Sequence, residues 1–280
     1  MIKDFKIMGV LNVTPDSFSD GGKFSQLDTA IQQANQMIGQ GADIIDVGGE
    51  STRPGAALVS VEEELTRVLP VIKALRKAHP DLTISIDSSK AEVMDAAIHA
   101  GANFINDVNA LEGHSEGEGD DEAIEVAVKH DVEVCLMHKK GLPENMQDNP
   151  DYDDVVQTVL DYFEQRVEAC LSCGMDPDRI ILDPGIGFGK TLEHNLQLLR
   201  NTATFKQMGF PVLIGVSRKS MFGDLLNRNV DERLPGSLAV AQFCYLQGAD
   251  IFRVHDVQAT QDVLTTSHHL IGINPDRKQP

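Results

Sequence analysis

Eight short apolar runs, each followed by a loop and a helical stretch, are the feature of this chain that most restricts its fold. Near-continuous apolar runs of this length are typical of strands that are buried on both faces, as in a parallel sheet. Their regular alternation with helices predicts an α/β fold. The runs lie at residues 7–13, 43–49, 83–88, 103–108, 133–138, 179–185, 211–217 and 251–256.

Helical patterns occupy the segments that separate the apolar runs. One begins at Ser60, which Glu63 follows three residues later, and another opens at Asp154; both beginnings are N-cap signals. Pro70 lies inside the first of these helices, so we expect a kink or a break there. The helical segments are 27–40, 60–78, 90–100, 121–130, 151–173, 191–207, 235–247 and 257–271.

The number of strand–helix units predicts how the sheet closes. Eight units in 280 residues favour a single (β/α)8 TIM barrel over residues 1–280, because that fold usually takes about 250 residues. A doubly wound open sheet is the competing arrangement. Eight units without a Pro- or Ser-rich linker or a shift of composition favour the closed barrel in one domain.

Charge and composition exclude several classes of protein. The chain has 43 acidic and 24 basic residues, a net charge of −19, so polyanions such as nucleic acids and anionic membranes are not expected partners. No apolar run approaches the roughly 18 residues of a membrane helix. The start, MIKDFKIMGVLNV, has no signal-peptide pattern, and four cysteines make no disulfide framework. We therefore expect a cytoplasmic protein.

Polar residues end every apolar run, at the edge where a TIM barrel carries its active site. Any one of them could be a turn residue that terminates its strand, but a polar residue at all eight ends indicates a site. Asp46 lies within its run and is the member most expected to serve only a neighbour. The set is Asn12, Asp46, Asp87, Asn106, His138, Asp183, Ser217 with Lys219, and Arg253 with His255.

The chemistry of this set suggests a flat heterocycle and an anion. Carboxylates and amides at Asp87, Asn106 and Asp183 could read the edge of a nitrogen-rich ring. Cations suit a phosphate or carboxylate ligand, and the chain offers Arg53, Lys219, Arg253 and His255. The sequence has no G-x-S-x-G, HExxH or Walker motif, so it lacks the motifs of the common serine hydrolases, zinc proteases and P-loop NTPases.

The segments that carry these residues resemble the dihydropteroate synthases, which are pterin-binding TIM barrels. The matching stretches are GVLNVTPDSFSDGG (9–22), IIDVGGESTRPGA (44–56), ISIDSSK (84–90), FINDV (104–108), CLMH (135–138), LDPGIGFGK (182–190), VSRKS (216–220) and RVHDV (253–257). The resemblance implies a transferase that joins 4-aminobenzoate to 6-hydroxymethyl-7,8-dihydropterin diphosphate. The products would be 7,8-dihydropteroate and pyrophosphate.

The resemblance also implies a role for each matching residue. Asn12 would bind the Mg²⁺ that carries the diphosphate, and Arg253 would stack on the pterin and, with His255, bind the leaving group. The pterin would be held by Asp87, Asn106, Asp183 and Lys219. Phe188, Lys219 and Ser220 would lie beside the aminobenzoate, with Ser217 close by. Thr52, Arg53 and Pro54 would order over the site. The catalytic group would be Asp183, Lys219, Arg253 and His255.

Two features depart from the family pattern. Residues 112–122 form an acidic insertion that we interpret as a solvated loop, and Lys139 with Lys140 replaces more usual residues after His138, which affects the expected pterin contacts. The resemblance further implies a homodimer that is a sulfonamide target. Because the net charge is negative and the substrates are anions, we expect a basic rim around the site, formed by Arg53, Lys190, Arg218, Lys219, Arg253 and His255.

Other pterin-related functions remain open at this stage. A barrel that transfers a methyl group from methyltetrahydrofolate shares the pterin-holding Asp and Asn positions, but it would not need the SRK and RVH cations. A non-catalytic pterin-binding protein would be expected to lack Asn12, Arg53 or Lys219, and all three are present. A metal-dependent hydrolase would need more histidines at strand ends than His138 and His255.

Overall fold

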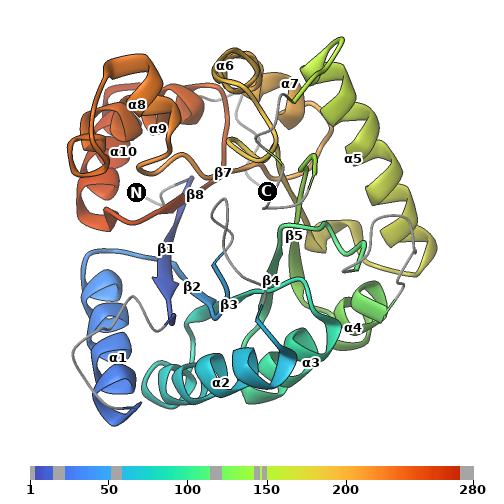
Figure 1. Ribbon diagram of the computed structural model, residues 1–280, viewed down its shortest axis with the longest axis vertical. Coiled ribbons are helices and arrows are strands. Elements are labelled where there is room, and N and C mark those ends of the chain that lie inside the picture. The colour runs from blue at the N-terminus through green and yellow to red at the C-terminus, as the bar shows by residue number, and fades with distance from the viewer. Residues whose placement is uncertain are drawn as a thin grey trace.

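The fold is a ring of eight parallel strands surrounded by helices (Figure 1). The computed structural model describes residues 4–14, 23–51, 59–113, 122–141, 146 and 150–271, with the backbone alone for 23–25. The strand order is β6-β5-β4-β3-β2-β1-β8-β7. A bridge between Leu182 and Val212 joins the two outer strands, and the Leu182 N–H donates to the Pro211 carbonyl at 2.9 Å. The predicted TIM barrel is therefore confirmed.

All eight predicted strands are present, although most are shorter than their apolar runs. The largest difference is at residues 211–217, where only two residues pair as a strand because the chain turns soon afterwards; the Lys219 N–H donates to the Val216 carbonyl at 3.2 Å. The strands are β1 (Lys6–Asn12), β2 (Ile44–Gly48), β3 (Thr83–Asp87), β4 (Phe104–Asp107), β5 (Glu133–Met137), β6 (Ile180–Asp183), β7 (Leu213–Ile214) and β8 (Ile251–Val254).

The helices follow the predicted segments with two differences. The segment 191–207 divides at Asn201 into two helices, and the six-residue helix α8 was too short to give a periodic signal. The helices are α1 (Lys23–Gly39), α2 (Val61–Ala78), α3 (Ala91–Ala100), α4 (Glu122–His130), α5 (Val155–Ser172), α6 (Leu192–Arg200), α7 (Thr202–Lys206), α8 (Met221–Leu226), α9 (Leu234–Leu246) and α10 (Val257–Ile271), with 3-10 turns η2 (Pro177–Arg179) and η3 (Val230–Glu232).

The predicted N-caps are confirmed, and of the kink or break predicted at Pro70, the break is wrong. Ser60 Oγ accepts from the Glu63 N–H at 3.2 Å, and the Asp154 carboxylate accepts from the N–H groups of Val156 and Gln157. Helix α2 continues through Pro70 to Ala78. Pro70 is exposed, so water can bond the carbonyl that lost its helical partner.

Two layers of side chains fill the interior of the barrel. The lower layer is apolar and consists of Met8, Ile44, Phe104, Cys135, Ile181, Leu213 and Ile251. Because alternate residues of a strand point to the same face, the residue two positions later on several strands also points inward. On β2, β4, β6 and β8 these residues are Asp46, Asn106, Asp183 and Arg253. The strand period thus places a polar layer directly above the apolar one.

A larger apolar core lies between the strands and the helices. The described part of the chain has four free cysteines, of which Cys135, Cys170 and Cys244 are buried and Cys173 is exposed. Among the helices described, none is both long enough and apolar enough to cross a membrane.

Candidate active site

Asp46 is the central acceptor of the polar layer at the carboxyl ends of the strands. Its carboxylate is fully buried and accepts from Ser85 Oγ at 2.6 Å, from Asn106 Nδ2 at 3.0 Å and from Arg253 Nε at 2.7 Å. These bonds use oxygens that a ligand would otherwise approach. Asp46 therefore orients three neighbours, as its place within the strand predicted.

Arg253 bridges two buried carboxylates. Its Nε donates to Asp46, and its second guanidinium nitrogen donates to Asp87 Oδ2 at 2.6 Å. Only 24% of the arginine side chain is exposed, so it lies inside the mouth rather than on the rim. The expectation that Arg253 contributes a net positive charge at the rim is therefore wrong, because the two aspartates compensate it.

Several oxygens of the polar layer face the mouth without a donor from the described residues. Asp183 Oδ1 accepts from the Gly185 N–H at 2.8 Å, but its Oδ2 has no such partner. Within the parts of the chain that the structure describes, Asp87 Oδ1, Asn106 Oδ1 and the side-chain amide of Asn12 also have no hydrogen-bond partner. Burial raises the pKa of Asp183, and it raises that of Asp87 to about 7 even beside Arg253. These acceptors form a rigid hydrogen-bonding edge.

Lys219 is the cation of the mouth that has no carboxylate partner within the described residues. Its Nζ donates to the Ile186 carbonyl and lies 4.3 Å from the centroid of the Phe188 ring. Burial lowers the pKa of this amine to about 8, against the opposing effect of Asp183. Gly187 has a φ of +85°, and a Cβ there would lie 3.1 Å from the lysine stem. The absence of a side chain at Gly187 thus lets the Lys219 side chain pack directly against the backbone of this loop.

Lys190 does not lie on the rim, and its assignment to a basic rim is wrong. It is 2% exposed, and its Nζ donates to the carbonyls of Gly185 and Phe188, both at 3.0 Å, and of His138 at 3.2 Å. It also lies 3.0 Å from His138 Nδ1, which must be the acceptor because an ammonium only donates. Burial lowers the pKa of His138 to about 2, so that ring is neutral.

The loop that follows β6 requires its glycines. A Cβ at Gly185 would lie 1.8 Å from the His138 carbonyl oxygen, and one at Gly189 would lie 2.1 Å from that of Lys140. Both glycines have positive φ. Lys190 and these glycines together hold the loop, and with it Phe188, against the end of β5. Lys140 itself contacts the Tyr152 ring, with its Nζ 4.5 Å from the centroid.

Ser217 and His255 meet where β7 and β8 end. Ser217 Oγ accepts from the His255 N–H at 3.1 Å and lies 3.0 Å from His255 Nδ1. His255 is exposed and Ser220 is exposed at the start of α8. Arg218 is paired with the Asp256 carboxylate at 2.5 and 2.9 Å, so it too is not an uncompensated rim cation.

The connection between β2 and α2, called the second loop here, is held at its two ends by residues that the motif analysis did not assign. Glu50 Oε1 accepts from the Val59 N–H at 3.0 Å, across the loop, and the Glu50 carboxylate pairs with Lys90. Lys90 also donates to the fully buried Glu64 at 2.6 Å. Lys90 ends the ISIDSSK stretch, and its position after a strand was the available signal. Thr52, Arg53 and Pro54, like most of the acidic insertion, lie outside the described residues.

The chain matches a known family over most of its length. The model of the family described as pterin binding enzyme matches residues 8–255. A dihydropteroate synthase of Haemophilus influenzae is 51% identical over 259 residues, which is 92% of this chain and 91% of the relative. That of Escherichia coli strain K12 is 50% identical over 258 residues, with 92% of this chain and 89% of the relative covered.

Solved structures agree with the sequence comparisons. The Yersinia pestis dihydropteroate synthase, in a sulfonamide drug complex, superposes with a TM-score of 0.87 at 46% identity and covers 96% of this chain and 94% of its own. The Xanthomonas albilineans enzyme in complex with 7,8-dihydropteroate gives a TM-score of 0.85 at 40% identity, with the same coverage.

Proposed function

The chain belongs to the dihydropteroate synthase family of pterin-binding enzymes, and we propose that the polar layer of its barrel mouth binds the pterin while the loops above it bind the aminobenzoate. The activity is that of a transferase in folate biosynthesis. It condenses 4-aminobenzoate with 6-hydroxymethyl-7,8-dihydropterin diphosphate and releases pyrophosphate. The observation that carries the assignment of roles is the set of oxygens, on the buried side chains of Asp87, Asn106 and Asp183, that have no donor among the described residues.

The pterin ring is assigned to these oxygens because they match its donors. A pterin presents N–H groups along one edge, and Asp87, Asn106 and Asp183 offer carboxylate and amide oxygens there. Two of these side chains are held in place before binding, since Asn106 donates to Asp46 and Asp87 accepts from Arg253. Arg253 also presents a guanidinium plane on which a flat ring can stack. An ordered site of this kind loses little side-chain entropy when the ring enters.

The aminobenzoate is assigned to the loops that follow β6 and β7. Lys219 is a cation without a carboxylate partner in the described chain, and the Phe188 ring lies next to it. A benzoate needs one positive group for its carboxylate and one apolar surface for its ring, and this pair supplies both. Ser220, exposed beside them, can donate a further hydrogen bond. A sulfonamide that copies the aminobenzoate would meet the same groups.

The diphosphate is assigned to the end of β8 and the start of β1. His255, held by Ser217, and Arg253 would contact it, together with Arg53 of the second loop. An Mg²⁺ fits at Asn12, because the amide oxygen has no partner among the described residues and residue 48 is glycine. A Cβ there would lie 3.7 Å from Asn12 Oδ1 and 3.5 Å from Asp87 Oδ2, so glycine keeps this space open. Mg²⁺ accepts few protein ligands when phosphates and water complete its shell.

Charge placement explains how the reaction proceeds without a nucleophilic side chain. Asn12 would hold an Mg²⁺ that, when bound, would supply positive charge to the leaving diphosphate. The dihydropterin stabilises positive charge at its exocyclic methylene, and the Asp183 carboxylate on the ring nitrogens spreads that charge. Lys219 orients the aminobenzoate so that its amine faces the methylene. Bond breaking then precedes attack, and we expect rates in substituted aminobenzoates to depend only weakly on amine nucleophilicity.

A pyrophosphate-release assay tests the metal assignment. With both substrates, omission of Mg²⁺ is expected to abolish release, and Asn12→Ala is expected to raise the Mg²⁺ concentration needed for half-maximal rate by at least about tenfold. Val13→Ala, at the buried residue that follows Asn12 after the end of β1, is the matched control for a local packing change and should leave that concentration unchanged. Equal rates with and without Mg²⁺ in chelator-treated protein would contradict the metal assignment.

We propose a homodimer because α8, α9 and α10, at the upper left of Figure 1, each carry exposed apolar side chains. Helices α9 and α10 lie side by side, with Gln242 Nε2 donating to Ser267 Oγ at 2.8 Å. Exposed apolar patches of this kind usually mark protein contacts. The exposed side chains are Leu225 and Leu226 on α8, Phe243 and Leu246 on α9, and Leu270 and Ile271 on α10.

A charge placed in this apolar face is expected to separate the protomers. Phe243→Asp with Leu246→Asp should convert a dimer to a monomer in sedimentation equilibrium, because each aspartate would be desolvated in the contact. Leu171→Asp, at an exposed leucine of α5, is the matched control and should leave the mass unchanged. A monomeric wild-type chain at micromolar concentration would contradict the proposal.

We also propose a cytoplasmic location, which suits free cysteines.

A further inference from the structure

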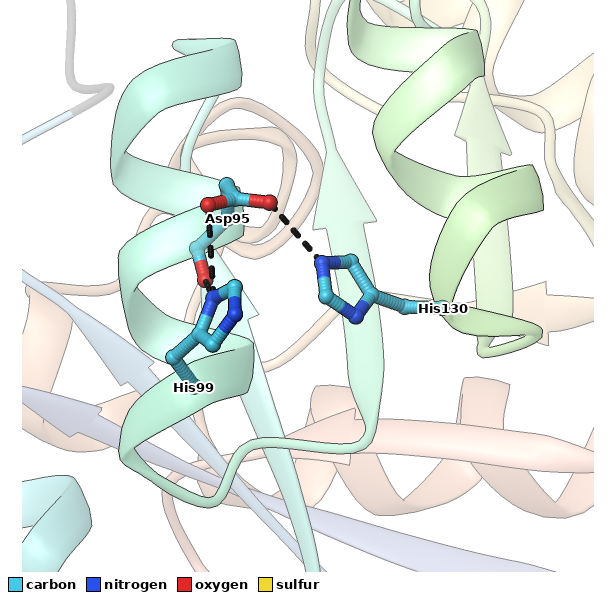
Figure 2. A group of neighbouring side chains, drawn as sticks. All are labelled: Asp95, His99 and His130. Carbon is cyan, nitrogen blue, oxygen red and sulfur yellow. Dashed lines mark hydrogen bonds and ion pairs between the residues drawn. The ribbon is translucent and has the colours of Figure 1, made fainter.

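Two histidines and one aspartate converge on the outside of the barrel, away from the mouth. Asp95 and His99 lie one turn apart on α3, and His130 ends α4 (Figure 2). One ligand atom from each lies within 4.8 Å of the others, and the described residues contain no other group of three such side chains. The helices return from the mouth, so their last turns lie near the opposite end of the barrel.

Both histidines already contact the carboxylate of Asp95. His130 Nε2 lies 2.8 Å from Asp95 Oδ1, and His99 Nδ1 lies 3.3 Å from Asp95 Oδ2. Ligand atoms around a tetrahedral Zn²⁺ are about 3.3 Å apart, since each bond is about 2.0–2.2 Å long. An ion could therefore enter after shifts of about 1 Å in side-chain position, without movement of either helix.

We propose that Asp95, His99 and His130 bind a divalent transition-metal ion, with Zn²⁺ as the representative ion. Two imidazole nitrogens and one carboxylate oxygen suit Zn²⁺, whereas Mg²⁺ prefers oxygen ligands. Three protein ligands at a partly exposed position leave a further coordination site for water. The bound ion would connect the last turns of α3 and α4.

Two further features favour a cation at this position. His99 and His130 lie in the last turns of their helices, where unpaired carbonyls make the helix end negative. A cation already occupies part of the space: Lys129 Nζ lies 2.9 Å from Asp95 Oδ1. The hydrogen bonds from Lys129 and His130 lower the pKa of Asp95 to about 2, so the carboxylate is ionised at neutral pH.

A bound metal ion would replace the present contacts of His99, His130 and Lys129 with Asp95. His99 Nδ1 and His130 Nε2, which now point at the Asp95 carboxylate, would each have to be unprotonated when the metal binds. Any proton on these nitrogens would be released or would move to the other ring nitrogen, and the free lone pairs would bind the metal. His99 Nδ1 would also leave the Asp95 carbonyl, which lies 2.8 Å away. Lys129 would swing into solvent, and its side chain is 61% exposed, so it is free to do so.

Zn²⁺ binding can be measured directly by equilibrium dialysis and by the visible absorption of Co²⁺ used as a spectroscopic probe. We expect the full-length wild-type chain to bind one more equivalent of Zn²⁺ than His99→Ala or His130→Ala, whose affinity at this site should fall at least about tenfold. Lys129→Ala should bind more tightly, because the competing ammonium is gone. Saturating Zn²⁺ should raise the Tm of wild type by roughly 5 °C but not that of the two histidine variants.

The controls separate this site from the barrel mouth and from surface histidines in general. Asn12→Ala should retain the additional equivalent, and so should His269→Ala, which removes another exposed histidine. All cluster variants should keep wild-type pyrophosphate release. The proposal is overturned if wild type and the His99→Ala/His130→Ala double variant bind the same number of Zn²⁺ ions, or if His269→Ala loses as much Zn²⁺ as His99→Ala.

Discussion

Substitution of Arg253 by alanine is expected to lower kcat/KM by about two to three orders of magnitude and also to destabilise the protein by about 3–5 kcal/mol. The loss of activity would follow from removing the guanidinium that we propose stacks on the ring and contacts the leaving group. The loss of stability follows from the two buried carboxylates of Asp46 and Asp87, which would lose their shared cation. Chemical denaturation and steady-state kinetics measure the two effects separately.

A second substitution distinguishes these two roles of Arg253. In the double variant Arg253→Ala/Asp46→Asn, one buried charge is gone, so a substantial part of the lost stability should return while the activity stays low. Arg253→Lys keeps one charge but cannot span both aspartates. If Arg253→Ala has the stability of wild type, the guanidinium does not compensate these carboxylates, and its interior position would have to be revised.

Substitution of Lys219 by methionine is expected to lower kcat/KM for 4-aminobenzoate by about two to three orders of magnitude, with a change in stability of less than about 1 kcal/mol. Methionine keeps the apolar stem that packs near Gly187 and removes only the charge. Unlike Arg253, Lys219 has no carboxylate partner in the described chain that would be left unpaired. Competition with sulfonamides should weaken in parallel, because we propose that they bind the same cation.

The pH profile provides a second readout for Lys219. Burial lowers the pKa of its amine to about 8, so the positive charge is lost as the pH rises through that value. In wild type, kcat/KM should therefore fall above about pH 8, and Lys219→Arg should move this decline to higher pH because arginine stays charged. A decline that persists unchanged in Lys219→Arg would assign it to another group.

The barrel and its polar layer could be predicted because both follow from the positions of the strands. Eight apolar runs identify the strands, and the polar residues that end these runs lie at the edge where a TIM barrel carries its active site. Asp87, Asn106 and Asp183 were located in this way. Asp46 was recognised as a residue that serves its neighbours, because it lies inside its run instead of at the end.

Charge compensation could not be predicted, because ion-pair partners are distant in the sequence. Arg253 pairs with Asp46 and Asp87, which lie on other strands, and Arg218 pairs with Asp256, which follows β8. Lys190 follows a glycine-rich loop, and only the path of that loop turns its amine inward, onto backbone carbonyls. A net count of charges in motifs therefore overestimates the positive charge of the mouth.

The two halves of the site differ in how much substitution they can tolerate. The polar layer belongs to the strands that close the barrel, so a change at Asp46, Asp87 or Arg253 that weakens inhibitor binding would also weaken folding. Lys219 and Ser220 lie on a connecting loop and can change at lower cost in stability. We therefore expect resistance to compounds that copy the aminobenzoate to arise readily, whereas compounds that fill the pterin pocket should select few viable variants.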